Sequence, residues 1–169
     1  MKYFIGIEIP KIYKTKIEML RAEFKFFTTE PHITLIPPPA LPDDDFFIKQ
    51  VIDICKEIPS LKINLGNIGQ FGKRVLYVSV DSPDLINLNN KIYDNLNLEK
   101  EKREYTPHLT IAKERRGKPI DFDEIKKRAE IKLIPAPLYT INSIVVYHQP
   151  KERSIYVPYM KIPLHQEER

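Results

Sequence analysis

Two short segments of the chain, EPHITL and TPHLTI, share the pattern proline, histidine, apolar residue, threonine, apolar residue. Alternate residues of a β-strand point to the same face of a sheet. If both segments are strands, His32 and Thr34 project together, and so do His108 and Thr110, while the apolar residues between and after them enter a core. Each strand then presents an imidazole beside a hydroxyl group.

Two such pairs facing one cleft would suit phosphate chemistry. Imidazole titrates near neutral pH, so one histidine can accept a proton from water while the other donates a proton to a leaving oxygen. The threonine hydroxyls can donate hydrogen bonds to non-bridging phosphate oxygens and hold the phosphorus between the imidazoles. This chemistry requires no metal and no cofactor, and none is expected. The alternative interpretation is a pair of core histidines, each hydrogen-bonded to its neighbouring threonine.

The surrounding pattern predicts an α+β unit that occurs twice. A strand at residues 1–9 leads through Pro10 into a helix, then the first histidine strand, then a helix at residues 43–58 with Asp43 to Asp45 at its positive end. A hairpin follows at residues 61–80, with its turn at GKR. The order then repeats: a helix after Ser82, the second histidine strand, a helix opened by Asp121, and two strands near residues 138–147 and 154–162. We therefore expect one domain over residues 1–169, made of two pseudo-symmetric halves at about 1–72 and 73–169, with the possibility that strands are exchanged between them.

The paired motifs PHITL and PHLTIAK resemble the two His-x-Thr motifs of the 2H phosphoesterase superfamily, which includes the RNA 2′,3′-cyclic phosphodiesterases, also called 2′-5′ RNA ligases. This resemblance covers essentially the whole chain and implies a bilobal fold, with two antiparallel sheets lining a central cleft and helices outside. It also implies that the catalytic residues are His32, Thr34, His108 and Thr110, with His32 as proton donor and His108 as proton acceptor. The sequence departs from many members at IPPP after the first motif, and at Lys113, where arginine is common; lysine lacks the bidentate fork of arginine.

Further residues are candidates for substrate binding. The loop after the second motif carries Lys113, Arg115, Arg116 and Lys118, which could contact phosphates of an oligonucleotide or could form a solvated turn. Phe71 and Tyr105 could stack on a base, although packing at the rim of the core is the alternative. We expect a buried, inert Cys55, a structural role for His148, and a disordered polar tail around His165.

Composition is that of an ordinary globular protein: 42% hydrophobic and 30% charged residues, with a net charge of +4 that weakly favours an anionic partner. A single cysteine excludes an internal disulfide and fits a reducing compartment.

No leader or membrane span is predicted, so we expect a cytoplasmic monomer acting on RNA or a nucleotide with a cyclic phosphate, with possible reverse 2′-5′ ligation. The alternatives are a phosphodiesterase for 2′-5′ oligoadenylates or small cyclic nucleotides, and an RNA-binding or regulatory protein with little turnover.

Overall fold

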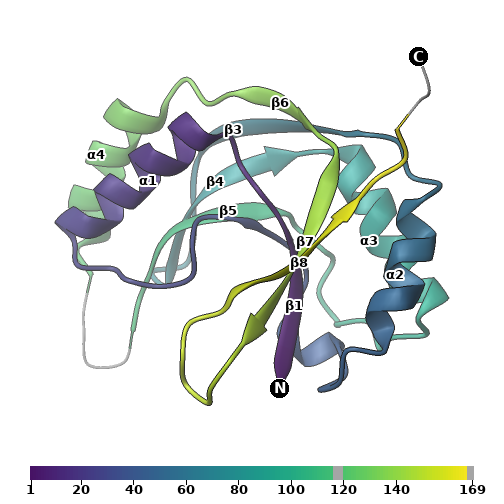
Figure 1. The fold of residues 1–169 in the computed structure, drawn as a ribbon. Coiled ribbons are helices and arrows are strands. Elements are labelled where there is room, and N and C mark those ends of the chain that lie inside the picture. The colour runs from purple at the N-terminus through teal and green to yellow at the C-terminus, as the bar shows by residue number, and fades with distance from the viewer. Residues whose placement is uncertain (116–119, 167–169) are drawn as a thin grey trace.

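The computed structural model describes residues 1–115 and 120–166. Their elements follow the order β1 (Lys2–Ile7), α1 (Lys11–Glu23), β2 (Ile33–Ile36), a short 3₁₀ helix η1 (Pro38–Ala40), α2 (Phe47–Cys55), β3 (Leu61–Phe71), β4 (Val75–Asp81), α3 (Pro83–Asn95), β5 (His108–Lys113), α4 (Phe122–Leu133), β6 (Leu138–Ile141), β7 (Ser143–Gln149) and β8 (Val157–Pro163). The α+β class expected from the sequence is confirmed (Figure 1).

The strands form one curled antiparallel sheet of eight strands in the order β6-β3-β4-β5-β2-β1-β7-β8. The expected two sheets thus correspond to two groups of four strands, which a pairing between β2 and β5 joins into one sheet. This pairing, called the seam below, has a single registered pair, Ile33 with Leu109. The strand β7 lies between β1 and the edge strand β8, and β3 lies between β4 and β6. Three pairings, β6 with β3, β5 with β2 and β1 with β7, therefore join strands that are not consecutive in the sequence, while the division of the chain into halves near residue 72 stays a prediction.

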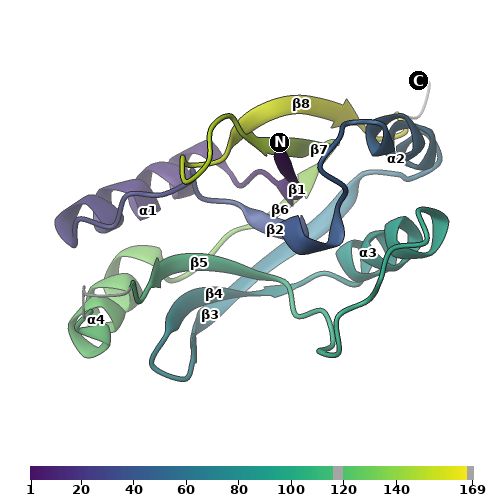
Figure 2. The ribbon, with the colours of Figure 1, turned by 90° about the horizontal axis from the view of Figure 1, so that it is seen from below.

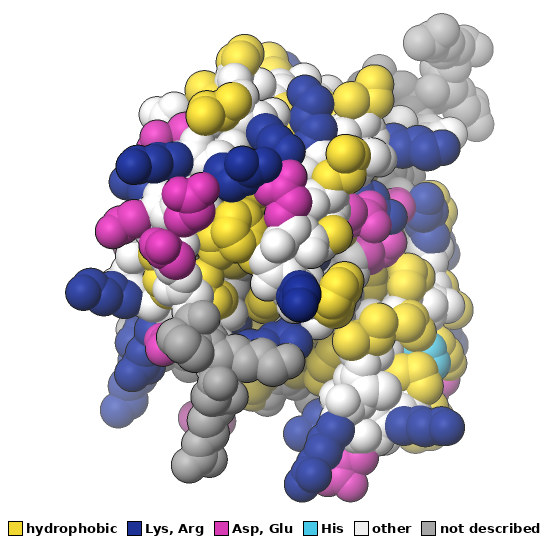
Figure 3. Space-filling model, turned by 90° about the vertical axis from the view of Figure 1, so that its left-hand side faces the viewer, with side chains coloured by type: hydrophobic (Ala, Val, Ile, Leu, Met, Phe, Trp, Pro, Cys, Tyr) yellow, Lys and Arg dark blue, Asp and Glu magenta, His cyan; other side chains and the backbone are white. Residues whose placement is uncertain are grey.

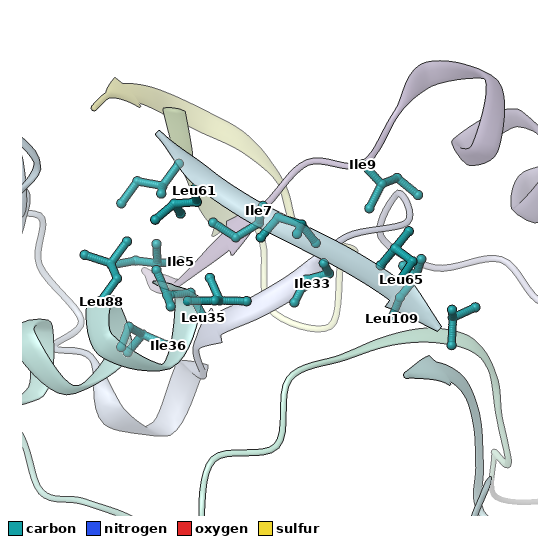
Figure 4. Close-up of a cluster of buried hydrophobic side chains, with 14 of the residues drawn as sticks. Ile5, Ile7, Ile9, Ile33, Leu35, Ile36, Leu61, Leu65, Leu88 and Leu109 are labelled. Atoms are coloured by element: carbon teal, nitrogen blue, oxygen red, sulfur yellow. The ribbon is translucent and has the colours of Figure 1, made fainter. Parts of the chain in front are cut away.

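The helices cover one face of the sheet in two pairs. In Figures 1 and 2, α1 lies beside α4 and α2 lies beside α3. The Tyr13 hydroxyl on α1 donates to the Leu133 carbonyl at the end of α4 over 3.1 Å. Between this helical layer and the sheet lies one continuous core, and Figure 4 shows its central aliphatic residues. Ile33, Leu109 and Ile111 belong to it and are almost completely buried, as the alternation of the two motifs predicts.

Local signals placed most helix starts correctly. The Ser82 hydroxyl accepts a hydrogen bond from the Leu85 amide at the start of α3, and the Asp121 carboxylate accepts one from the Glu124 amide at the start of α4. The prediction for residues 43–58 was wrong at both ends, because α2 covers only Phe47–Cys55 and has no side-chain cap. Of the three aspartates, Asp44 instead accepts from the Phe46 amide in the turn before the helix.

Candidate active site

The two motifs meet at the seam. Continuing the antiparallel register of Ile33 and Leu109 by one residue in each direction aligns His32 with Thr110, and Thr34 with His108. These four side chains point away from the core, because Ile33 and Leu109 between them point into it. The two histidines are diagonal neighbours, a relationship that separates Cα atoms by about 7–8 Å. The sheet therefore brings together all four residues expected to be catalytic.

Both imidazoles are held in the same way. The Nδ1 atom of His32 lies 2.7 Å from the Glu30 carbonyl oxygen, and Nδ1 of His108 lies 2.9 Å from the Thr106 carbonyl oxygen. A carbonyl oxygen only accepts hydrogen bonds, so each Nδ1 must carry the proton. The proline between carbonyl and histidine fixes this turn of the backbone. Each ring thus keeps its Nε2 atom for proton transfer.

Each histidine also lies against a stacked pair of aromatic rings. Phe4 stacks on Tyr147 with a centroid distance of 4.6 Å, and His32 lies 4.8 Å from Phe4 and 5.4 Å from Tyr147. In the second motif, Phe71 stacks on Tyr77 at 4.2 Å. His108 lies 5.1 Å from Phe71 and 5.6 Å from Tyr77. Sequence reasoning missed Phe4, Tyr77 and Tyr147; the signal that could have found them is their place on the polar face of alternating strands.

The stack beneath His108 depends on a glycine in the neighbouring strand. Gly69 is paired with Tyr77 across β3 and β4, and a Cβ atom at Gly69 would lie 2.6–2.7 Å from the Tyr77 ring. Such a contact is far too short, so only glycine lets Tyr77 lie flat over β3. The position of this ring is therefore specified jointly by two residues on different strands.

Electrostatics distinguishes the two motifs. Burial lowers the pKa of His32 to about 4; the hydrogen bond to the Glu30 carbonyl opposes this shift, while the positive charges of Arg21 and His108 add to it. His32 is therefore neutral at pH 7 when no anion is bound. Its surroundings include the Glu30 carboxylate, which accepts from Lys14 at 2.7 Å and from the Tyr147 hydroxyl at 3.3 Å.

A cleft of about 1060 Å³ opens beside His108 and Thr34. It extends along the β3–β4 turn and the loop before β5, and His32 and Thr110 are not among its lining residues. The charged and aromatic residues that line it are Phe71, Arg74, Tyr93, Lys100, Glu101, Lys102, Arg103, Glu104 and Tyr105. The loop EKEKRE thus contributes five charged side chains to the cleft, a role that the sequence analysis did not give it.

The loop predicted to bind phosphates lies elsewhere, as far as the structure describes it. Arg115 donates to the Phe27 carbonyl over 2.6 Å and covers the Phe26 ring at 4.7 Å, so its guanidinium is engaged within the protein. Lys113 is exposed at the end of β5, and neither residue lines the cleft. Arg116 and Lys118 lie outside the described residues.

The two aromatic residues predicted to stack on a base, Phe71 and Tyr105, differ in how accessible they are to a ligand. Phe71 is 40% exposed and lines the cleft, so part of its ring is accessible to a ligand. Tyr105 also lines the cleft, but its hydroxyl donates to the Thr34 carbonyl over 2.7 Å. This bond connects the segment before the second motif to the strand of the first motif. A contact of either ring with a base stays a prediction.

The remaining candidates have structural surroundings. Cys55 is completely buried, and burial raises the pKa of its thiol to about 12, as expected for an inert thiol. His148 lies on β7 next to Tyr159, with a ring distance of 4.8 Å.

Within residues 1–115 and 120–166, no group of three His, Cys, Asp or Glu side chains is placed to hold a metal ion. No helix in this part of the chain is long and apolar enough to cross a membrane.

Comparison with known proteins identifies the protein family to which this chain belongs. A sequence model described as the 2′-5′ RNA ligase superfamily matches residues 16–153, so the chain belongs to this family. The RNA 2′,3′-cyclic phosphodiesterase of Methanocaldococcus jannaschii is 27% identical over 124 residues, which cover 67% of this chain and 71% of that protein. The family and this relative support an activity of the 2H phosphoesterase type, that is, a cyclic phosphodiesterase or an RNA ligase.

Solved structures show the same fold. A crystal structure described as a phosphoesterase has a TM-score of 0.65 and 19% identity, with 98% of both chains covered. Escherichia coli LigT in complex with 3′-AMP has a TM-score of 0.62 and 20% identity, again with 98% of both chains covered. At these identities the likeness concerns the fold alone.

Proposed function

We propose that this protein hydrolyses 2′,3′-cyclic phosphates at the ends of RNA or on nucleotides, with His32, Thr34, His108 and Thr110 as its catalytic residues. The observation that carries the proposal is the matched pair of imidazoles at the seam. Both Nδ1 atoms donate to a carbonyl two residues upstream, which leaves two Nε2 atoms on the same face of adjacent strands. Two histidines with only structural roles would not require the same Nδ1 hydrogen bond in both motifs.

In the proposed reaction, one Nε2 atom accepts a proton from water as the water oxygen forms a bond to phosphorus. The bond from phosphorus to one ribose oxygen breaks, and the other imidazole donates its Nε2 proton to that oxygen. The product is a phosphomonoester beside a free ribose hydroxyl, and the two histidines have exchanged protonation states. A proton exchange with solvent restores the starting state. If a 5′-hydroxyl attacks the cyclic phosphorus in place of water, the bond from phosphorus to the 3′ oxygen breaks, that oxygen takes the donated proton, and the product is a 2′-5′ linkage.

The roles of the two histidines depend on the bound anion. The family resemblance makes His32 the proton donor, but burial keeps this residue neutral at pH 7 in the free protein. A phosphate between the rings favours the protonated form of His32, because an anion stabilises a nearby positive charge. In the proposed cycle His32 therefore takes up its proton together with the substrate, and His108 acts as the base.

Thr34 and Thr110 complete the site as hydrogen-bond donors. Each lies across the seam from the histidine of the other motif, so each can reach a phosphate held between the two rings. Their hydroxyls would donate to the non-bridging oxygens and orient phosphorus for attack in line with the leaving oxygen. This role explains why threonine, two residues after each histidine, belongs to the pattern.

The cleft supports RNA as the substrate rather than a mononucleotide alone. Its volume of about 1060 Å³ lies slightly above the range of small-molecule sites, about 300–1000 Å³. Lys102 and Arg103 are exposed at its rim and form no ion pair within the described residues. In this proposal Phe71 stacks on the base next to the cyclic phosphate, and the loop contacts phosphates further along the chain.

A substrate panel with product analysis tests the proposal. The panel contains nucleoside 2′,3′-cyclic phosphates, a short RNA ending in a 2′,3′-cyclic phosphate, 2′-5′ oligoadenylate and a 3′,5′-cyclic nucleotide. We expect wild-type turnover of the first two, and loss of turnover in His32→Ala and His108→Ala. Preference for 2′-5′ oligoadenylate or the 3′,5′-cyclic nucleotide would favour the alternative phosphodiesterases. Tight RNA binding without turnover of any compound would favour the RNA-binding protein.

A further inference from the structure

Two buried polar side chains, Arg21 and Asn89, bind the strands of the two motifs from the helical layer. Arg21 lies on α1 and is 7% exposed, and Asn89 lies on α3 and is 6% exposed. The Asn89 side-chain amide donates to the Leu35 carbonyl over 2.8 Å. Arg21 donates from Nε to the Ile111 carbonyl at 3.1 Å and from Nη2 to the Thr110 carbonyl at 2.7 Å.

The acceptors occupy equivalent positions in the two motifs. Leu35 and Ile111 each follow the threonine of their motif directly. Each is also the extra residue of a β-bulge: β1 and β2 shift register so that Leu35 has no partner, and β4 and β5 shift so that Ile111 has none. A bulge leaves the extra residue outside the hydrogen-bonded ladder. The side chains of Asn89 and Arg21 supply the missing partners.

The connections run crosswise. The helix α1 precedes the first motif, yet its Arg21 binds the second; the helix α3 precedes the second motif, yet its Asn89 binds the first. Arg21 further donates from Nη1 to the Thr29 carbonyl at 2.9 Å, three residues before His32. One guanidinium therefore holds both the approach to His32 and the strand that carries His108.

The seam itself needs such support. Only Ile33 and Leu109 are registered between β2 and β5, whereas β1 and β7 share five registered pairs. The relative position of the two histidines is thus weakly fixed by backbone hydrogen bonds. Burial lowers the pKa of Arg21 to about 10, so its guanidinium is charged at neutral pH, and within the described residues no carboxylate forms an ion pair with it. A buried charge without a counter-ion is expensive, so its hydrogen bonds to the three carbonyls must offset much of that cost.

We propose that Arg21 and Asn89 are positioning residues that cross-brace the two motifs and set the geometry between the His32 and His108 rings. The inference rests on the proposed function of this site. Arg21 does not line the cleft, and Asn89 lies in the cleft wall almost completely buried, with its side-chain amide donating to the Leu35 carbonyl. In the proposal each side chain acts through the backbone that carries a catalytic pair. A displacement of about 1 Å between catalytic groups lowers a rate by about 10²-fold, so loss of a brace is expected to lower kcat by 10–100-fold and change KM by less than about 3-fold.

The experiment compares Arg21→Met, Arg21→Lys and Asn89→Leu with the control Ser82→Ala. Ser82 is also buried and caps α3, but it binds Lys62 and Leu85 rather than a motif strand. Its removal costs about 1 kcal/mol of stability without touching the braces. Kinetics on a nucleoside 2′,3′-cyclic phosphate, thermal unfolding, and long-range ¹H–¹⁵N spectra of the imidazole rings are recorded for each protein. We expect lowered kcat and altered histidine spectra in the brace variants, and wild-type kcat and spectra in the control.

Three results decide the question. Brace variants that are folded and keep wild-type kcat and spectra overturn the proposal, and so does an equal loss of kcat in Ser82→Ala. If Arg21→Met does not fold, Arg21→Lys replaces it, because lysine keeps the positive charge but lacks the planar guanidinium that donates to three carbonyls. The same criteria then apply to Arg21→Lys and to Asn89→Leu. If the wild-type protein turns over no cyclic phosphate, the proposed function fails by itself; the brace is then judged on the spectra, which require no activity.

Discussion

Ile33 of β2 and Leu109 of β5 face each other across the seam, and both side chains are completely buried. This one apolar pair aligns the two motifs, because the alternation of a strand then places His32 beside Thr110 and Thr34 beside His108 on the opposite face. A shift of this register by one residue would turn one catalytic pair into the core. The chemistry of the site therefore depends on a contact that takes no part in it.

Replacement of either histidine should abolish most of the activity. We expect His32→Ala and His108→Ala each to lower kcat by about 10²–10⁴-fold, the usual contribution of a positioned proton donor or acceptor. The double variant should be little worse than the single ones, because the pair acts as a unit. Single-turnover rates with a 2′,3′-cyclic phosphate measure this effect, and circular dichroism controls for folding. Near-normal activity in either single variant would contradict the mechanism.

The threonines should matter less than the histidines. Thr34→Val and Thr110→Val preserve shape and remove one hydroxyl donor each, so we expect losses of about 10-fold to 10²-fold in kcat, in line with a single neutral hydrogen bond in the transition state. Steady-state kinetics of the two variants measure the loss. Thr15→Val, on the exposed surface of α1, is the matched control and should behave as wild type. Valine variants as inactive as the histidine variants would argue that the hydroxyls do more than orient phosphate.

The buried His32 should make stability depend on pH. Its pKa is about 4 in the folded protein and about 6.5 when unfolded, so between these values the unfolded chain binds a proton that the folded protein does not. The free energy of unfolding should therefore fall as the pH decreases from 6.5 to 4, by at most about 1.4 kcal/mol per pH unit. Urea unfolding of the wild type and His32→Gln at pH 7 and pH 4.5 measures the difference. Parallel losses in both proteins would show that His32 is not its source.

Chelation should leave the activity unchanged. The proposed proton transfers use only imidazole and hydroxyl groups, so the protein should keep its full rate after prolonged treatment with EDTA. The measurement is turnover of a cyclic phosphate before and after dialysis against the chelator, with metal content determined in parallel. Loss of activity that a divalent ion restores would assign the reaction to a different mechanism.

The loop before β5 should discriminate between long and short substrates. Lys102→Ala combined with Arg103→Ala should lower kcat/KM for a short RNA with a cyclic end by about 10-fold and reduce its salt dependence, because two phosphate contacts are lost. Turnover of a nucleoside 2′,3′-cyclic phosphate should be unchanged. The control variant, Lys126→Ala with Lys127→Ala, removes the same charge from α4, on the face where Figure 3 shows cationic and anionic side chains intermixed. An equal effect in both double variants would mean that net charge alone attracts RNA.

The sequence by itself determined the parts that depend on local patterns. A proline, a histidine and a threonine at fixed spacing within an alternating strand are sufficient to predict that Ile33 and Leu109 enter the core, which burial confirms. The caps at Ser82 and Asp121 could be read in the same way, since a cap involves residues three positions apart. The failure at Asp43–Asp45 has a local cause as well: an aspartate can bind the backbone of a preceding turn as readily as that of a helix.

Only the tertiary structure decided which distant segments share the site. Arg21 lies 90 residues from Ile111, and no periodicity in α1 distinguishes a buried arginine from an exposed one. The basic residues after the second motif and those before it look alike in the sequence, yet Arg115 binds Phe27 within the protein while Lys102 and Arg103 line the cleft. The strand order places segments distant in the sequence next to one another, with β2 beside β5 and β1 beside β7. Pairing between strands is a long-range property, because any strand with a suitable apolar face can satisfy the local pattern, and only the packing of the whole chain selects its neighbour.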